Sequence, residues 1–207
     1  KGMIRSCISP SAQVAKCVRV TYDTTVLFDD MSNGGGIACD IENALRMNAD
    51  CMAVQTFIGT PGESRSLELL CRTADAGTRY GIPTLGVVAV GKQMERTEKF
   101  FQLATRVLAE NGANVVKSYF CEGFERVAAA CPVPIVIAGG KKLPELDALE
   151  MAYQAIDQGA HGVDMGRNIF QSDCPAGMAQ AIGKVVHEGY TAKQAHEVYQ
   201  EVKNQNA

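Results

Sequence analysis

The chain has 207 residues, of which 46% are hydrophobic, and this is enough apolar material for one sizeable core. The formal net charge is −3 and acidic and basic residues are mixed along the chain, which argues against a nucleic acid as partner. No uninterrupted run of about 18 apolar residues is present, which argues against membrane binding. We therefore expect a single domain, residues 1–207, in a soluble cytoplasmic protein.

The eight cysteines are scattered without a Cys-x-x-Cys pair, and most lie inside apolar runs. A thiol in such a run acts as a small hydrophobic group, so we expect reduced cysteines and neither a disulfide framework nor a zinc site. His161, His187 and His196 lack the spacing of metal ligands. We expect no metal site and no tightly bound cofactor.

Short apolar runs alternate with amphipathic stretches along the chain. Asp40 is a candidate N-cap for a helix that continues to Asn48. Further helices are expected from apolar residues at helical spacing over 67–74, 101–108, 124–130 and 146–156. Strands are expected over 17–22, 51–56, 83–90, 114–119, 134–138 and 163–165.

Strands that are apolar on both faces and separated by helices predict a parallel sheet covered by its crossovers. A doubly wound sheet would normally carry a Gly-x-Gly-x-x-Gly turn, and none is present. A closed barrel instead holds phosphate after strands seven and eight, and barrels usually have about 250 residues. The predicted fold class is therefore α/β, a (βα)8 TIM barrel with the N-terminal one to two strands missing from this chain.

Lys117 lies in the middle of an apolar strand, which would be strand six of this barrel. An amine that is removed from water favours its neutral form, which can attack a carbonyl carbon and form an imine. The alternative is a lysine near the barrel mouth whose amine extends to solvent. We interpret Lys117 as a catalytic nucleophile because of the loops that follow it.

Two of these loops combine glycine with a cation. Gly139 and Gly140 allow the backbone to approach an anion, and Lys141 or Lys142 adds positive charge. Gly166 and Arg167 follow the next strand, and a guanidinium suits a forked hold on phosphate. Each loop alone could be an ordinary turn or a surface ion pair. Because they follow consecutive strands, we interpret them as one phosphate-binding site, formed by Gly139, Gly140, Lys141, Gly166 and Arg167.

Other motifs carry less weight. The segment 86–92 has the glycine and lysine spacing of a nucleotide-binding loop, but Gln93 replaces the required Ser or Thr. The segment 32–36 reads as a flexible glycine-rich loop. Gln55 and Tyr119 lie at the ends of strands and are candidate substrate contacts, although Gln55 could equally be an ordinary satisfied polar group.

The motifs at 115–119, 137–142 and 166–171 resemble those of the Schiff-base (class I) aldolase family that includes deoxyribose-phosphate aldolase and archaeal-type fructose-bisphosphate aldolase. Within it, residues 131–173 are most similar to the thiolase branch that processes autoinducer-2. The resemblance implies a TIM barrel, Lys117 as the active-site lysine, and the five residues named above around the substrate phosphate. It also implies a homo-oligomer, pentamer or decamer, and coenzyme A as a co-substrate that accepts acetyl from a phosphorylated dione.

Two departures from the family pattern bear on the activity. The acidic residue of the family's first strand has no counterpart here, and its strand-five tyrosine falls where this chain reads Gly86-Val87-Val88-Ala89. Loss of a positioned acid or base costs about 10²–10⁴-fold, which weakens ordinary aldol cleavage. We favour the thiolase reaction. A class I fructose-bisphosphate aldolase and a non-catalytic phosphosugar-binding barrel remain as alternatives.

Overall fold

The structure is a computed structural model that describes residues 1–9, 11–24, 34–90 and 94–205. These residues form two compact units. The first unit contains residues 1–95 and 103–116, and the second contains residues 96–102 and 117–207. Helix α4 (Glu98–Glu110) and strand β6 (Val115–Tyr119) contribute residues to both units. That the whole chain forms one barrel domain stays a prediction.

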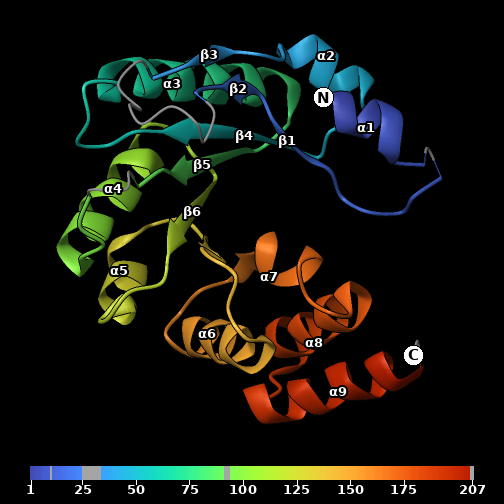
Figure 1. Ribbon diagram of the computed structural model, residues 1–207. Helices are drawn as coiled ribbons and strands as arrows, with labels where there is room; N and C mark the ends of the chain where they lie inside the picture. The colour runs from blue at the N-terminus through green and yellow to red at the C-terminus, as the bar shows by residue number, and fades with distance from the viewer. Residues whose placement is uncertain (10, 25–33, 91–93, 206–207) are drawn as a thin grey trace. The chain divides into compact units, whose positions relative to one another are not determined.

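The first unit is built on three parallel strands, β1 (Cys17–Arg19), β4 (Cys51–Thr56) and β5 (Thr84–Val88). The sheet order is β1-β4-β5, and the long helix α3 (Glu63–Tyr80) packs against β4 and β5. Figure 1 shows α3 running beside these strands. The helix ends at Gly81, whose N–H donates to Gly77 O, and the positive φ of 73° at this glycine lets the N–H of Ile82 also donate to Gly77 O at 3.0 Å.

Two shorter helices and a small hairpin complete the first unit. These are α1 (Gly2–Cys7), α2 (Ile41–Arg46), β2 (Thr21–Tyr22) and β3 (Gly36–Ile37), with β2 and β3 antiparallel. Asp40 caps α2 as predicted, because its carboxylate accepts a hydrogen bond from the N–H of Asn43 at 2.9 Å. Helix α2 ends at Arg46, two residues before the predicted end.

The single strand predicted at 17–22 was wrong in extent. Val20 N–H donates to Ala53 O of β4, and Val20 O accepts from the N–H of Ala38 at 2.7 Å. The chain therefore leaves the parallel sheet at this residue, and Thr21 and Tyr22 pair with β3 instead. The predicted glycine-rich loop and nucleotide-like motif lie partly outside the described residues, at 32–33 and 91–93. Residues 84–88 form strand, as the sequence indicated.

The second unit contains the end of β6, two parallel strands and six further helices or helical turns among the described residues. The strands are β7 (Ile135–Ala138) and β8 (Gly162–Asp164), which are neighbours with Ala138 opposite Asp164. The helical segments are α5 (Phe124–Ala130), α6 (Glu145–Asp157), α7 (Arg167–Phe170), α8 (Pro175–Glu188) and α9 (Ala192–Gln205), besides the first turn of α4.

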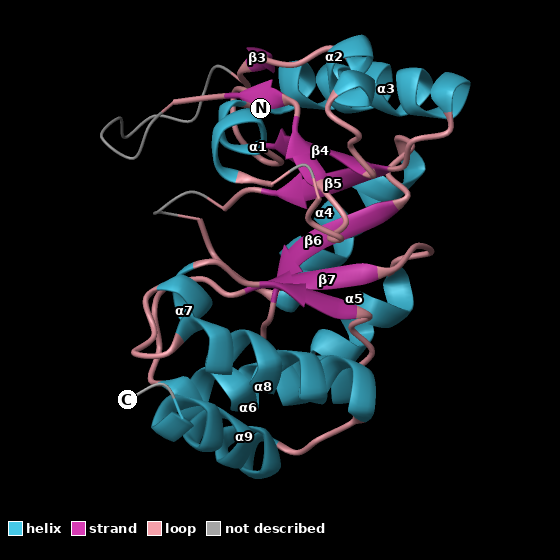
Figure 2. Cartoon of the chain, turned by 90° about the vertical axis from the view of Figure 1, so that its right-hand side faces the viewer, coloured by secondary structure: helices cyan, strands magenta, loops and turns pink. Residues whose placement is uncertain are grey.

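Helices α6, α8 and α9 pack against one another, as Figures 1 and 2 show. Their shared core is apolar and fully covered, and it includes Leu149, Ala152, Met178, Ala181, Val185, Ala195 and Tyr199. Helices α8 and α9 were not predicted from the sequence. In the part of the chain that the structure describes, no helix combines the length and apolar character needed to cross a membrane.

Candidate active site

Lys117 lies in the middle of β6, and alternation along the strand sets its direction. Val116 and Ser118 are completely buried, whereas Lys117 and Tyr119 are partly exposed. Because successive side chains of a strand point to opposite faces, Lys117 and Tyr119 share the less buried face. Val116 is β-branched, and such side chains pack well on the buried face of a strand.

The amine of Lys117 forms an ion pair with a residue that the sequence analysis did not single out. Its Nζ atom lies 2.8 Å from Oδ2 of Asp164, at the end of β8. The side chains are 23% and 50% exposed, respectively, so the pair is open to solvent on the carboxylate side. The sequence predicted an amine shielded from water. In the structure the amine of Lys117 is paired with the carboxylate of Asp164.

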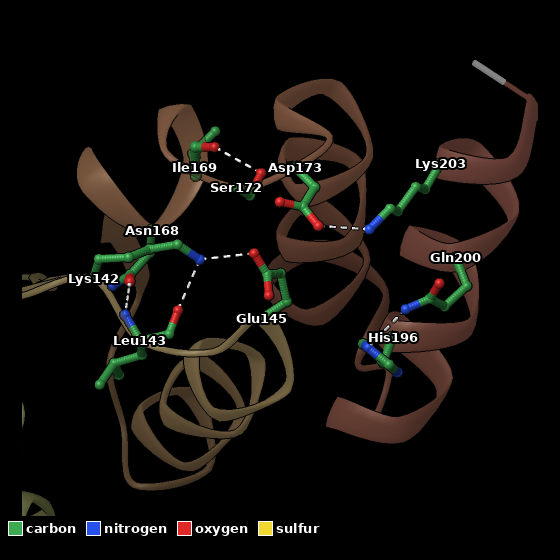
Figure 3. Close-up of polar contacts among 10 residues, drawn as sticks. All are labelled: Lys142, Leu143, Glu145, Asn168, Ile169, Ser172, Asp173, His196, Gln200 and Lys203. Atoms are coloured by element: carbon green, nitrogen blue, oxygen red, sulfur yellow. Dashed lines mark hydrogen bonds and ion pairs between the residues drawn. The ribbon is translucent and has the colours of Figure 1, made fainter. Parts of the chain in front are cut away.

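Asn168 connects the two loops that the sequence interpreted as a phosphate site. It is fully buried, its Nδ2 donates to Gly139 O at 2.7 Å, and its Oδ1 accepts from the N–H of Leu143 at 2.8 Å. Figure 3 shows Asn168 beside Leu143, which lies in the loop that joins β7 to α6. One side chain thus holds the loop after β7 against the turn after β8, because backbone groups of the first are satisfied by the second.

Glycine is favoured at positions 139 and 140, after β7, for two different physical reasons. A Cβ at Gly139 would lie 2.9 Å from Met165 Cγ and 3.0 Å from Asn168 Nδ2, so a side chain would force these loops apart. Gly140 has a φ of +64°, and a Cβ there would meet nothing within 4 Å. The backbone at Gly140 is therefore open on the side where a Cβ would stand, which allows a ligand to approach it closely.

The cations of the two loops differ in whether they already have partners. Nζ of Lys142 lies 2.7 Å from Glu145 Oε1 and also donates to Leu143 O at 2.8 Å (Figure 3). This hydrogen bond from Lys142 holds the pKa of Glu145 below its ordinary value. Lys141 and Arg167 are exposed and make no ion pair or side-chain hydrogen bond with any described residue. The two charges that remain available are thus those of Lys141 and Arg167.

The two candidate substrate contacts have different surroundings. The ring of Tyr119 lies 6.2 Å from that of Phe101, measured between centroids, and the guanidinium carbon of Arg96 lies 4.4 Å from its centroid. Gln55 lies on β4 in the first unit, where its N–H donates to Thr21 Oγ1 at 3.2 Å. Contact of either side chain with a substrate stays a prediction.

Sequence reasoning missed Asp164 and Asn168. A carboxylate that ends an otherwise apolar strand was the available signal for Asp164, yet its partner depends on which face it occupies. Asn168 follows Arg167 in a motif that was quoted only for its glycine and arginine. A buried asparagine that satisfies two backbone groups leaves no composition signal of its own.

Comparisons with known proteins give a consistent family. Residues 12–172 match the model of the DeoC/LacD family aldolases. The chain is 51% identical over 204 residues to the 3-hydroxy-5-phosphonooxypentane-2,4-dione thiolase of Enterobacter sp., which covers 98% of this chain and 68% of the relative. It is 50% identical over 200 residues to an uncharacterized aldolase of Pasteurella multocida, covering 96% of this chain and 68% of the relative.

Solved structures support the fold. An archaeal fructose 1,6-bisphosphate aldolase superposes with a TM-score of 0.82 at 22% identity, covering 91% of this chain and 77% of the other. The fructose-bisphosphate aldolase of Slackia heliotrinireducens gives a TM-score of 0.80 at 21% identity, covering 91% and 67%. The predicted α/β barrel fold is confirmed, with the described residues supplying fewer parallel strands than the eight of a complete barrel. The chain belongs to the DeoC/LacD family of aldolases.

Proposed function

We propose that this protein breaks a carbon–carbon bond in a phosphorylated ketone through Lys117, and that it transfers the acetyl group of 3-hydroxy-5-phosphonooxypentane-2,4-dione to coenzyme A. The observation that carries the proposal is the Lys117–Asp164 pair, an amine on the partly exposed face of β6. Relatives of 48–51% identity over nearly the whole chain bear the name of this thiolase, which selects the substrate.

The structure of the dione fixes the bond that must break. Carbons 2 and 4 are ketones, carbon 3 carries the hydroxyl group between them, and carbon 5 carries the phosphate. Cleavage between carbons 2 and 3 releases carbons 1 and 2 as the acetyl group. Carbons 3 to 5, with one added proton, are dihydroxyacetone phosphate. The balanced reaction is dione plus coenzyme A thiol to acetyl-coenzyme A plus dihydroxyacetone phosphate.

Lys117 would accept the electrons of the broken bond. Its neutral amine condenses with the ketone at carbon 4 and releases water, which gives an iminium ion next to carbon 3. When the thiol sulfur adds to carbon 2 and loses its proton, the bond between carbons 2 and 3 breaks and its electron pair forms an enamine. Protonation at carbon 3 and hydrolysis of the imine return the free lysine and release dihydroxyacetone phosphate.

The phosphate of this substrate is one carbon away from the ketone that reacts, so a phosphate site must lie close to Lys117. Asp164 contacts the amine, and Arg167 follows it by three residues, which can span at most roughly 11 Å of backbone. The guanidinium of Arg167, the amine of Lys141 and the open backbone at Gly140 would together hold the anion. Gly139 allows the two loops their close approach, because a Cβ there would meet Met165 and Asn168, whereas a Cβ at Gly166 would meet Phe170 of its own helical turn.

The family resemblance also supports a proposal about the assembly and location of the protein. We expect a homo-oligomer, a pentamer or decamer, in the cytoplasm, with coenzyme A as a soluble co-substrate that is not retained. Light scattering coupled to size-exclusion chromatography measures the subunit number directly. A monomer at micromolar concentration would contradict the expected assembly without affecting the chemistry at Lys117.

The test of the activity is formation of acetyl-coenzyme A from the dione and coenzyme A, followed by mass spectrometry. Lys117→Ala should lower kcat by at least about 100-fold, because the nucleophile is removed. Lys184→Ala is the matched control, since it deletes an exposed lysine paired with Glu188 on α8. Its rate should equal that of the wild type.

Three results would contradict the proposal in different ways. Unchanged turnover by Lys117→Ala would remove the lysine from the chemistry. Cleavage of fructose 1,6-bisphosphate without any thiolysis of the dione would favour the aldolase alternative. Binding of dihydroxyacetone phosphate with neither reaction would favour a phosphosugar-binding protein.

A further inference from the structure

We propose that Asp164 is a catalytic residue that takes the proton from Lys117 before imine formation and returns it when water leaves. This inference rests on the proposed imine chemistry at Lys117 and assigns a carboxylate to it. The sequence motifs identify no acid or base for this reaction, and the structure supplies a candidate at hydrogen-bond distance from the nucleophile.

The distance between the two groups allows direct proton transfer. Lys117 Nζ and Asp164 Oδ2 are 2.8 Å apart, which is the length of a hydrogen bond from a cation to a carboxylate. An ammonium ion has no lone pair and cannot attack a carbonyl carbon, so the ammonium must lose a proton before the reaction begins. The carboxylate is the acceptor that the structure places in contact with it.

The position of the pair in the sheet differs from that of most other ion pairs in the described residues. Lys184–Glu188, Arg106–Glu110 and Arg72–Glu68 join residues one helical turn apart. Lys117 and Asp164 are instead on β6 and β8, with β7 between these strands. Strands two apart in a sheet are separated by about 10 Å, so the lysine side chain must extend across β7.

The residue beneath this crossing is small. Ala138 on β7 lies opposite Asp164 in the ladder, and residues opposite each other in a parallel pair point to the same face. A methyl group there leaves room for the lysine side chain to cross β7 and reach the aspartate. The Lys117 side chain is 23% exposed and the Asp164 side chain is 50% exposed, so the pair is accessible to small molecules from solvent.

The proton balance of the step is complete with these two residues alone. The ammonium gives one proton to the carboxylate, and the neutral amine adds to the ketone to form a carbinolamine after an internal proton shift. The carboxylic acid then donates to the carbinolamine hydroxyl, which leaves as water. The products are the iminium ion, water and the original carboxylate, so that charge and hydrogen count match the starting ammonium and ketone.

The other charged groups of the two loops do not take the proton from Lys117. Lys141 and Arg167 are cations and cannot accept a proton from an ammonium ion. Lys142 and Glu145 are paired with each other. Among the described residues of these loops and strands, Asp164 is the carboxylate in contact with Lys117.

The experiment measures the rate at which dihydroxyacetone phosphate forms an adduct with Lys117 that borohydride traps, with the reaction quenched at intervals and read by mass spectrometry. Asp164→Asn should slow adduct formation by about 100-fold or more, the range of a positioned acid or base. Asp164→Glu should recover part of the rate. Binding of inorganic phosphate, measured by calorimetry, should stay within about twofold in all variants.

A second variant separates proton transfer from positioning. Asp164→Ala leaves space for a small carboxylate, so added formate should accelerate its adduct formation in a saturable manner. Asp173→Asn is the matched control, because it also removes a carboxylate paired with a lysine, Lys203, at 2.7 Å. It should react at the wild-type rate and should not respond to formate.

The outcomes distinguish this inference from the proposed function. Normal trapping of the wild type together with an unaffected Asp164→Asn variant would overturn the role of Asp164 and leave the lysine chemistry intact. A slow Asp164→Ala variant that formate does not accelerate would also overturn it, because the aspartate would then only position the lysine. Absence of any adduct in the wild type would overturn both the imine and the role of Asp164.

Discussion

At the scale of single residues, Asn168 decides how the two candidate phosphate loops are held together. Asn168→Ala would leave Gly139 O and Leu143 N–H without their buried partners. Each lost partner costs about 1–3 kcal/mol, so we expect the free energy of unfolding to fall by that amount or more. Urea denaturation measures the stability, and calorimetry should show weaker binding of inorganic phosphate.

A control for this prediction is Asn114→Ala in the first unit. The Asn114 side chain accepts a hydrogen bond from the N–H of Thr84 at 2.8 Å, so its loss also removes a bond from a side chain to the backbone. Stability should fall while phosphate binding is unchanged. Equal phosphate affinity in the Asn168→Ala and wild-type proteins would show that the hydrogen bonds of Asn168 do not shape an anion site.

Glu145 makes a prediction about pH. Lys142 holds the pKa of Glu145 below its ordinary value of 4.5, so the ionised carboxylate stabilises the folded state above that pH. The contribution disappears as the pH falls through the lowered value. Glu145→Gln should therefore cost no more than about 1 kcal/mol at pH 7, and the difference from wild type should vanish in acid. Urea denaturation of both proteins at pH 7 and in acid tests this prediction. A difference in the free energy of unfolding that is the same at the two pH values would contradict it.

At the scale of elements, helix α8 contains two glycines that should respond to substitution in opposite directions. A Cβ at Gly183 would meet nothing within 4 Å, so Gly183→Ala should raise the free energy of unfolding by about 0.5–1 kcal/mol. A Cβ at Gly177 would lie 3.1 Å from Cys174 Sγ and 3.2 Å from Tyr199 O on α9. Gly177→Ala should therefore be destabilising. Thermal denaturation compares the two, and similar shifts would contradict the described packing of α8 on α9.

The strands and helices around the candidate site could largely be predicted from the sequence. The strands predicted at 114–119, 134–138 and 163–165 correspond to β6, β7 and β8, with each end within one residue of the prediction. The break at Val20 could not be predicted, because both halves of 17–22 have strand composition and only the pairing partner differs. The contact of Asp164 with Lys117 could not be predicted for a similar reason, because it depends on strand order and on the face that each residue occupies.

At the scale of the whole molecule, the cysteines offer a test of the reduced state that the sequence indicated. None of the eight forms a disulfide in the structure. Cys7 and Cys17 are exposed, whereas burial raises the pKa of Cys39 and of Cys121. A thiol reagent should thus modify Cys7 and Cys17 first, and all eight after unfolding. Fewer than eight reactive thiols in denaturant without reductant would contradict free cysteines.

The proposed account is that Lys117 attacks a ketone whose phosphate lies in the loops after β7 and β8. It is supported by the family membership, the fold and the amine–carboxylate pair. Peptide mapping after borohydride reduction with dihydroxyacetone phosphate tests it most directly. The account predicts a single reduced adduct on the peptide that contains Lys117, and suppression of that adduct by inorganic phosphate. An adduct on Lys141 or Lys142 with Lys117 unmodified would contradict it.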